Sequence, residues 1–252
     1  MQDKRLNLKV DFNGYINSLN SEIDSHFVSL KTTLKSIENI SYLDHQTTGN
    51  TMVRMIISKP NPELFKKQEI NKSFKEIICS LQDFMDKLIA VSKISKEQII
   101  IKKSITDDEE LRQFLFEVEN SFIQKISKDK SLTSPKKLEL FKLGDIELNK
   151  IIKNYFEIRN SLEHHKGIAD REMILTCRKV IICVQDKEVE LIPFDVEGGE
   201  SITMKSKDVS RNIPINSQIE ITETEIEETL TTIKVFIATA LVAGISSSIN
   251  KQ

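Results

Sequence analysis

The chain has 252 residues, of which 39% are hydrophobic, 29% are charged and 6% are aromatic, with no Trp. These proportions supply enough apolar side chains for a buried core and exclude a disordered or low-complexity protein. The formal net charge of -2 at pH 7 excludes a surface that is basic throughout, so any binding of nucleic acid must use a local basic patch.

The N-terminal residues Met1–Asn7 include charges, and no apolar segment follows them, so we expect no secretory signal and a cytoplasmic protein. The apolar stretch Ile233–Ile249 contains a lysine and is short for a membrane span, which favours a buried helix or a subunit interface over a membrane contact. Cysteines occur in apolar runs without metal-ligand spacing, so they are expected to be reduced and buried: Cys79, Cys177 and Cys183.

The first half of the chain shows helical spacing in two places. Apolar residues recur at intervals of three and four from Phe12 to Ile40, which predicts a long amphipathic helix. The periodicity then breaks at 44–50, and the apolar run Met52–Ser58 fits either a strand or a helix. A second helix is predicted from Glu63 to Val91.

Three more helices are expected before residue 170. The first begins at Thr106, whose side chain would cap an acidic first turn, and runs to about Lys128. A short helix opens at Ser134, where a proline follows. A longer one opens at Gly144-Asp145 and ends near His165.

The pattern then changes to β-branched apolar runs, Cys177–Val184 and Val189–Phe194, and a pair of glycines precedes Ser201–Met204. These runs predict a small β-hairpin or three-stranded insertion, within 175–206. Thr222 is followed by several Glu residues and is expected to cap a last helix, from about Glu223 to Ile249. The predicted fold class is therefore mostly α.

The helix that ends near His165 carries the most informative residues. On a helical wheel Arg159 lies at the edge of the apolar stripe, whereas Asn160 and His164 lie four residues apart on a mostly polar flank. The apolar stripe itself consists of Leu148, Ile151, Tyr155, Ile158 and Leu162.

The segment Arg159-Asn160-Ser161-Leu162-Glu163-His164 resembles the motif of HEPN domains, which has Arg, a polar residue that is often Asn, three further residues and His. The tail Gly167-Ile168-Ala169-Asp170 is similar to the one that follows this motif in many bacterial HEPN-like proteins. Gly167 is also placed to end the helix. The likeness covers about thirteen residues of the chain.

This resemblance implies a HEPN-like antiparallel helical bundle that forms one domain over 1–252, with the β-rich insertion at 175–206 and the C-terminal helix at 223–250 returning to the bundle. It also implies a homodimer in which two motifs face one another and cleave RNA without a metal or other cofactor. A minimal HEPN bundle has no β-rich insertion, so we interpret the insertion as a partner-binding arm.

The residue types fit that chemistry. RNA cleavage beside a ribose 2′-hydroxyl needs a base, an acid for the leaving oxygen and a cation for the phosphate. His164 fits the base or the acid, Arg159 offers a planar fork of donors to phosphate oxygens, and Asn160 can orient a partner. Basic residues also cluster around the motif, and the candidates for RNA contact are Lys153, His165 and Lys166.

A purely structural explanation stays open. Arg159 could pair with Glu163 one helical turn away, and His164 could bind the last carbonyls of its helix. A run of lysines is also typical of a solvated face. In toxins that pair with nucleotidyltransferases, a Tyr follows the motif at the position of Lys166, so that mode of neutralisation is not supported here.

Two hypotheses follow. The first is a metal-independent endoribonuclease with a composite dimeric site that acts in anti-phage defence or as a toxin-like effector, with RNA as substrate and a regulatory or defence-system protein as a further partner. The alternative is a non-catalytic HEPN-like module that binds RNA or protein and serves for dimerisation. The biological role in both rests on analogy with the family.

Overall fold

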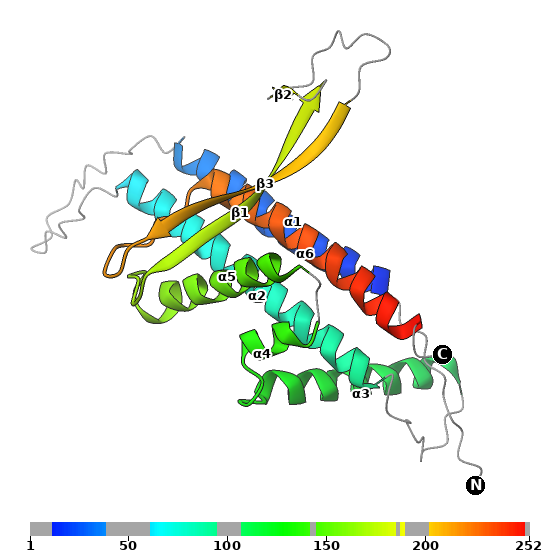
Figure 1. Ribbon diagram of the computed structural model, residues 1–252. Helices are drawn as coiled ribbons and strands as arrows, with labels where there is room; N and C mark the ends of the chain where they lie inside the picture. The colour runs from blue at the N-terminus through cyan, green and yellow to red at the C-terminus, as the bar shows by residue number, and fades with distance from the viewer. Residues whose placement is uncertain are drawn as a thin grey trace, which may run out of the picture.

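The computed structural model describes residues 12–38, 61–94, 107–141, 145–184, 187–189 and 202–249. It is mostly helical, with six helices and a small antiparallel sheet in these ranges (Figure 1). The helices are α1 (Phe12–Glu38), α2 (Pro62–Ile94), α3 (Asp108–Lys128), α4 (Ser134–Glu139), α5 (Ile146–His164) and α6 (Glu223–Ile249). The strands are β1 (Met173–Val184), β2 (Lys187–Val189) and β3 (Ile202–Ile213).

The buried core joins α1, α2, α5 and α6. Helix α1 contributes the inner face of its apolar stripe, including Leu19, Ile23 and Leu30, and α2 is buried along most of its length. The predicted apolar stripe of α5 is buried in full, because it packs between α2 and β1. Within the described ranges, no helix combines the length and the apolarity that a membrane crossing needs.

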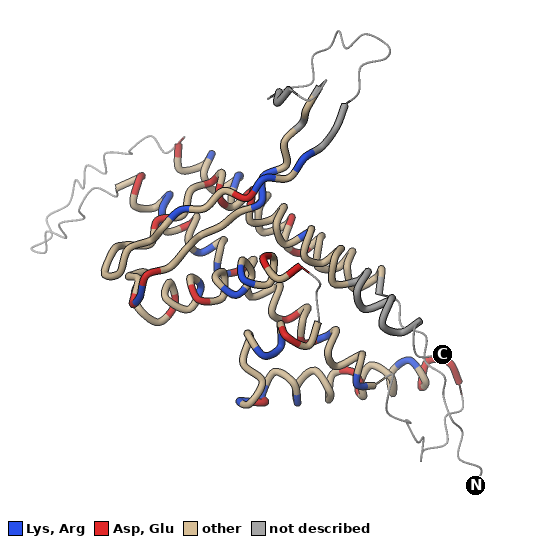
Figure 2. The backbone as a smooth tube through the Cα atoms, viewed as in Figure 1, with Lys and Arg blue, Asp and Glu red and all other residues tan. Residues whose placement is uncertain are grey.

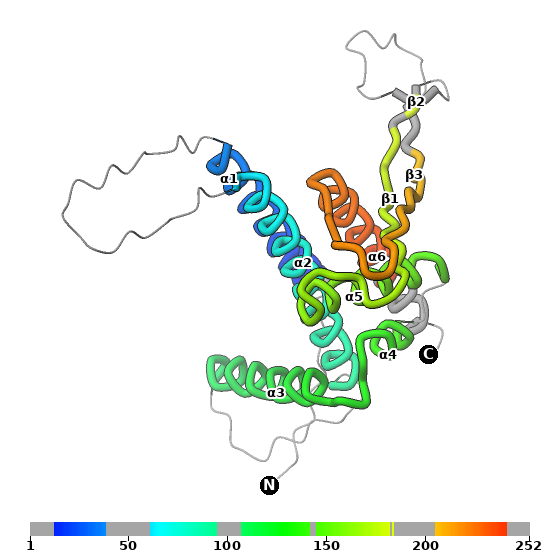
Figure 3. The backbone as a smooth tube through the Cα atoms, turned by 90° about the vertical axis from the view of Figure 1, so that its left-hand side faces the viewer, coloured from blue at the N-terminus to red at the C-terminus, as the bar shows by residue number. Residues whose placement is uncertain are grey.

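Helix α6 begins as the sequence predicts. The hydroxyl of Thr222 accepts from the Glu225 backbone N–H at 3.2 Å, and the Glu225 carboxylate accepts from the Thr222 N–H at 2.8 Å. This reciprocal pair is a capping box, which satisfies two backbone donors that the first turn of a helix leaves open. From there α6 packs against α1, α2 and β1 (Figure 3).

The predicted cap of α3 is wrong by one residue. The N-cap is Asp107, whose carboxylate accepts from the Glu110 backbone N–H at 2.8 Å. An ionised carboxylate at this position also interacts favourably with the positive end of the helix dipole. Thr106 itself lies outside the described residues, as does the ambiguous run 52–58.

The β-rich part is larger than predicted. β1 and β3 pair over their full length, from Met173 opposite Ile213 to Val184 opposite Ile202, and the short β2 adds to the other edge of β1. The bounds of 175–206 are therefore too narrow at both ends. Residues 190–194 of the predicted middle strand lie outside the described residues.

Two side chains bind the edge of β1 that faces the helices. The Tyr155 hydroxyl of α5 donates to the Thr176 carbonyl at 2.8 Å, and the Arg178 backbone N–H donates to the Thr232 hydroxyl of α6 at 2.7 Å. These bonds pair polar groups that would otherwise be unsatisfied at a strand edge. Beyond Arg178 the two strands project from the helices as an arm, which we define as residues 179–184 and 202–207 (Figures 1 and 3).

Candidate functional site

The candidate site lies at the C-terminal end of α5, where a tight turn reverses the chain. The backbone N–H groups of His165 and Gly167 both donate to the Ser161 carbonyl, at 3.1 and 3.2 Å. Between them the backbone enters the left-handed region, with φ of 55° at Lys166 and 76° at Gly167. A left-handed residue directly after the C-cap, here Lys166, is a common way for a helix to end, and the Gly167 bond reaches back six residues to a carbonyl of the last helical turn.

After the turn, the predicted Gly-Ile-x-Asp tail pairs with the chain that follows β3. The Gly167 carbonyl accepts from Ile219 N–H at 2.7 Å, and Ala169 exchanges backbone bonds with Ser217 and Asn216 at 2.9 and 2.8 Å. These bonds fix the direction of the tail, so that Asp170 returns to the side of α5.

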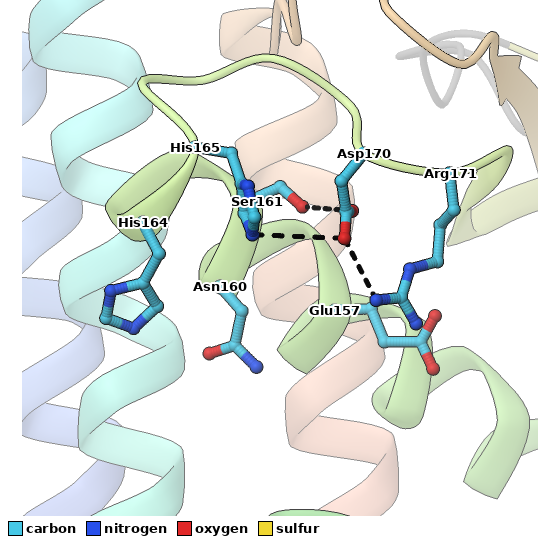
Figure 4. A pocket seen from close by; sticks show the side chains of 7 residues that line it. All are labelled: Glu157, Asn160, Ser161, His164, His165, Asp170 and Arg171. Atoms are coloured by element: carbon cyan, nitrogen blue, oxygen red, sulfur yellow. Dashed lines mark hydrogen bonds and ion pairs between the residues drawn. The ribbon is translucent and has the colours of Figure 1, made fainter.

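The end of α5 and the returning tail enclose an open pocket of about 320 Å³ (Figure 4). Its lining is almost entirely polar, with two His, two acidic groups and one Arg. The lining residues are Glu157, Asn160, Ser161, His164, His165, Asp170 and Arg171.

Asp170 organises one wall of this pocket. It accepts from the buried Ser161 hydroxyl at 3.1 Å and from Arg171 Nη2 at 3.0 Å, and His165 Nε2 lies 3.8 Å from its Oδ2. The hydrogen bond from Arg171 is the largest cause that lowers the pKa of the Asp170 carboxyl, and Ser161 and His165 act in the same direction. Asp170 is therefore held ionised beside the imidazole of His165.

His164 and Asn160 lie on the opposite wall of the pocket, as Figure 4 shows. The His164 ring is exposed and makes no hydrogen bond or ion pair within the described part of the chain. Counting back along α5, Asn160, Glu157 and Lys153 follow at helical spacing, so these residues form one solvent-facing stripe with His164. This stripe is the face on which the sequence places the Asn-His pair.

Arg159 does not line the pocket. Its guanidinium points towards α2, where Nη2 contacts Cys79 Sγ at 3.3 Å. Within α5, Nη2 contacts Glu163 Oε2 at 2.6 Å and Nη1 donates to Asn160 Oδ1 at 3.2 Å. Its Nε is buried and has no hydrogen-bond partner among the residues that the structure describes. Within one chain Arg159 therefore forms the ion pair with Glu163 that the structural explanation expects. Its link to the pocket is the hydrogen bond to Asn160.

Cys79 departs from the expectation that all three cysteines are buried. Cys177 and Cys183 are buried, whereas Cys79 is only partly buried. The thiol of Cys79 on α2 contacts Nη2 of Arg159 on α5 at 3.3 Å.

Of the three candidates for RNA contact, only His165 lines the pocket. Lys153 lies two turns before Asn160 on the same exposed stripe, and Lys166 is exposed in the turn. The sequence assigned no role to Ser161 or Glu157, which both line the pocket. Ser161 is buried beside the apolar stripe of α5. The best signal for Asp170 was its place in the tail.

The described residues contain no group of three or more His, Cys, Asp or Glu side chains that could hold a metal ion. What the pocket offers is two imidazoles, one beside a carboxylate and one open to solvent, with an amide and a guanidinium nearby. These groups can accept and donate protons and bind an anion. Comparisons with protein-family models, with curated proteins and with solved structures found no match to this chain.

Proposed function

We propose that this protein is a HEPN-type, metal-independent endoribonuclease whose site is completed in a homodimer. The observation that carries the proposal is the pocket at the end of α5, which places Asn160 and the unpaired imidazole of His164 together at the surface. The resemblance of residues 158–170 to the HEPN motif supports RNA as the substrate class.

In the proposed reaction, the ribose 2′-oxygen attacks the adjacent phosphorus and the bond from phosphorus to the 5′-oxygen breaks. His164 of one protomer accepts the proton of the 2′-hydroxyl, and the partner's His164 donates a proton to the leaving 5′-oxygen. Asn160 orients the attacking group by hydrogen bonding. Arg159 binds the non-bridging phosphate oxygens once RNA displaces it from Glu163.

A second function is favoured by one contact. Because Arg159 already binds Glu163 and Cys79, the same pocket could serve a non-catalytic HEPN-like module that binds RNA or protein. In both cases a role in anti-phage defence or as a toxin-like effector, under control of a partner protein, follows only from the family resemblance.

Cleavage assays separate the two functions. Purified protein is incubated with labelled RNA in EDTA, beside Arg159→Ala, His164→Ala and a control, Lys128→Ala, whose exposed lysine is the last residue of α3 and does not line the pocket. We expect each of the first two changes to lower the cleavage rate by about 10²-fold or more, since removal of a proton-transfer group has that effect, and the control to leave it unchanged.

Equal cleavage by all four proteins would rule out the proposed site. Binding of RNA without cleavage by the wild-type protein would instead establish the non-catalytic module. Glu163→Ala adds a sharper readout, because it releases Arg159 from its ion pair. The catalytic proposal expects the Glu163→Ala variant to cleave at least as fast as the wild type.

A further inference from the structure

The ladder of β1 and β3 is the most basic element of this acidic chain. Along the two strands there are five basic residues and one acidic residue, against a formal charge of -2 for the whole sequence. Figure 2 shows that they gather where the strands leave the helices. The basic residues are Arg178, Lys179, Lys205, Lys207 and Arg211, and the acidic one is Asp208.

The register places three lysines on one face of the ladder. Lys179 lies directly opposite Lys207, and Lys205 lies two residues earlier in β3, opposite Ile181. Side chains two residues apart on a strand point to the same side. A pair of like charges directly opposite one another weakens a ladder, so the pairing of Lys179 with Lys207 opposes folding unless an anion lies over it.

Two acidic side chains beside the ladder already pair with arginines, and Glu228 of α6 lies within electrostatic reach of Cys177 on β1. Asp208 points to the other face, where it binds Arg178 through two contacts of 2.8 and 2.9 Å. Glu225 binds Arg211 at 2.7 and 3.1 Å. Lys179 and Lys207 are exposed and make no ion pair with any residue that the structure describes. Their charges are therefore not neutralised by the described acids.

The composition of the ladder also restricts the ligand. Neither β1 nor β3 contains an aromatic residue, so this face has no platform on which bases could stack. Lysines on a strand that reads no base edges bind phosphates regardless of sequence. A phosphate backbone fits this face better than an individual base or nucleoside.

We propose that Lys179, Lys205 and Lys207 form a face that binds the phosphate backbone of an RNA strand. RNA as the ligand rests on the proposed function. The two sites lie along one strand, because β1 begins two residues after Arg171, and between them the helices cover Leu175 and Cys177 on the side of β1 that carries Lys179. A strand rises about 3.3 Å per residue, so roughly 26 Å of β1 separates Arg171 from Lys179. An RNA strand bound at both sites would have to span at least this distance.

The test measures RNA binding independently of cleavage. Fluorescence anisotropy with labelled oligouridine and oligoadenine is recorded in EDTA over a series of salt concentrations, with every protein carrying His164→Ala. The arm variant adds Lys179→Glu and Lys207→Glu. The matched control adds Lys128→Glu and Lys130→Glu, the same change of charge at the exposed end of α3, far from the arm (Figure 1).

We expect the arm variant to bind both oligonucleotides about tenfold more weakly. Each lost contact with a single strand lowers the slope of log K against log salt by about 0.7, so the slope should fall by roughly 1.4. The control should keep the slope of the parent. An unchanged affinity and slope in the arm variant would overturn the inference, as would an effect confined to one base.

Other uses of the lysines predict other results. Lysines protect exposed strand edges from pairing with other chains, and the sequence between the strands, residues 185–201, is rich in acidic residues. The lysines would then serve to protect the strand edge or to pair with these acidic residues. For both of these uses, charge reversal would change the unfolding midpoint or cause aggregation, while RNA binding stayed as in the control. The ribonuclease proposal fails separately, if the wild-type protein binds RNA through the arm but does not cleave it.

Discussion

The turn after α5 depends on two neighbouring residues with left-handed backbone, Lys166 and Gly167. A Cβ at Gly167 would lie 2.7 Å from Gln218 Nε2, which is the movable end of a side chain, so the main cost of a substitution comes from φ of 76°. We expect Gly167→Ala to lower the free energy of unfolding by about 1 kcal/mol, because residues with a Cβ disfavour this conformation.

Lys166→Gly provides the opposite change at the adjacent position. It relieves a non-glycine residue at φ of 55°, so we expect a small gain in stability, less than about 1 kcal/mol. Urea unfolding of both variants and the parent measures the two effects. A loss on Lys166→Gly as large as that on Gly167→Ala would show that the lysine side chain, and not the backbone, determines the turn.

Arg159 shows how far residues alone could predict the site. Helical spacing correctly separated Arg159 from the face of Asn160 and His164, because the wheel depends only on backbone geometry. The same spacing left two partners open for Arg159, Glu163 within the helix and a phosphate outside it. Only the contact with Cys79 on α2, 80 residues away, shows which way the guanidinium points.

At the scale of elements, the helices were predictable, whereas only the first residues of β3 were and its extension to Ile213 was not. Helices α1, α2, α5 and α6 each bury a stripe, and burial produces the apolar periodicity that the sequence displays. Residues 205–212 are all exposed, since β3 is an edge strand, so no burial pattern selects their side chains. The strand is held by backbone bonds to β1, which leave little signal in a single sequence.

The packing of β1 against α5 and α6 makes the protein sensitive to alkali. Burial raises the pKa of the Cys177 thiol from 9.0 to about 11, and burial likewise raises the pKa of Tyr155 well above 10.0. Both groups stay neutral in the folded protein while they ionise in the unfolded chain. Their contribution to the free energy of unfolding is complete below about pH 9. It declines as the pH rises towards 11, by at most about 1.4 kcal/mol per pH unit for each group.

Cys177→Ala removes one of these two groups, so the decline above pH 9 should become shallower even though the variant is less stable at neutral pH. Cys183→Ala is the control, because that cysteine is also buried in β1. Urea unfolding from pH 7 to pH 10.5 measures both slopes. Parallel curves for Cys177→Ala and the parent would show that the thiol does not contribute to the pH dependence.

At the scale of the whole molecule, the open stripe of Lys153, Glu157, Asn160 and His164 is the surface on which a second copy would close. In the described part of one chain, His164 is the imidazole on this stripe and has no partner, and Arg159 is turned away. If cleavage needs His164 from both copies, then His164→Ala subunits added to the wild type should be dominant inhibitors, because a mixed dimer has only one His164.

With random exchange and a fourfold excess of His164→Ala, about one fifth of the wild-type subunits stay paired with one another, so the cleavage rate should fall to about one fifth. RNA is kept in large excess so that the variant does not act by competing for substrate, and an equal mass of an unrelated protein is the control. A rate that stays constant over the whole mixing series would mean that each chain acts alone. In that case the second imidazole must come from the same chain, and His165, which Asp170 already holds at the pocket, is placed to supply it.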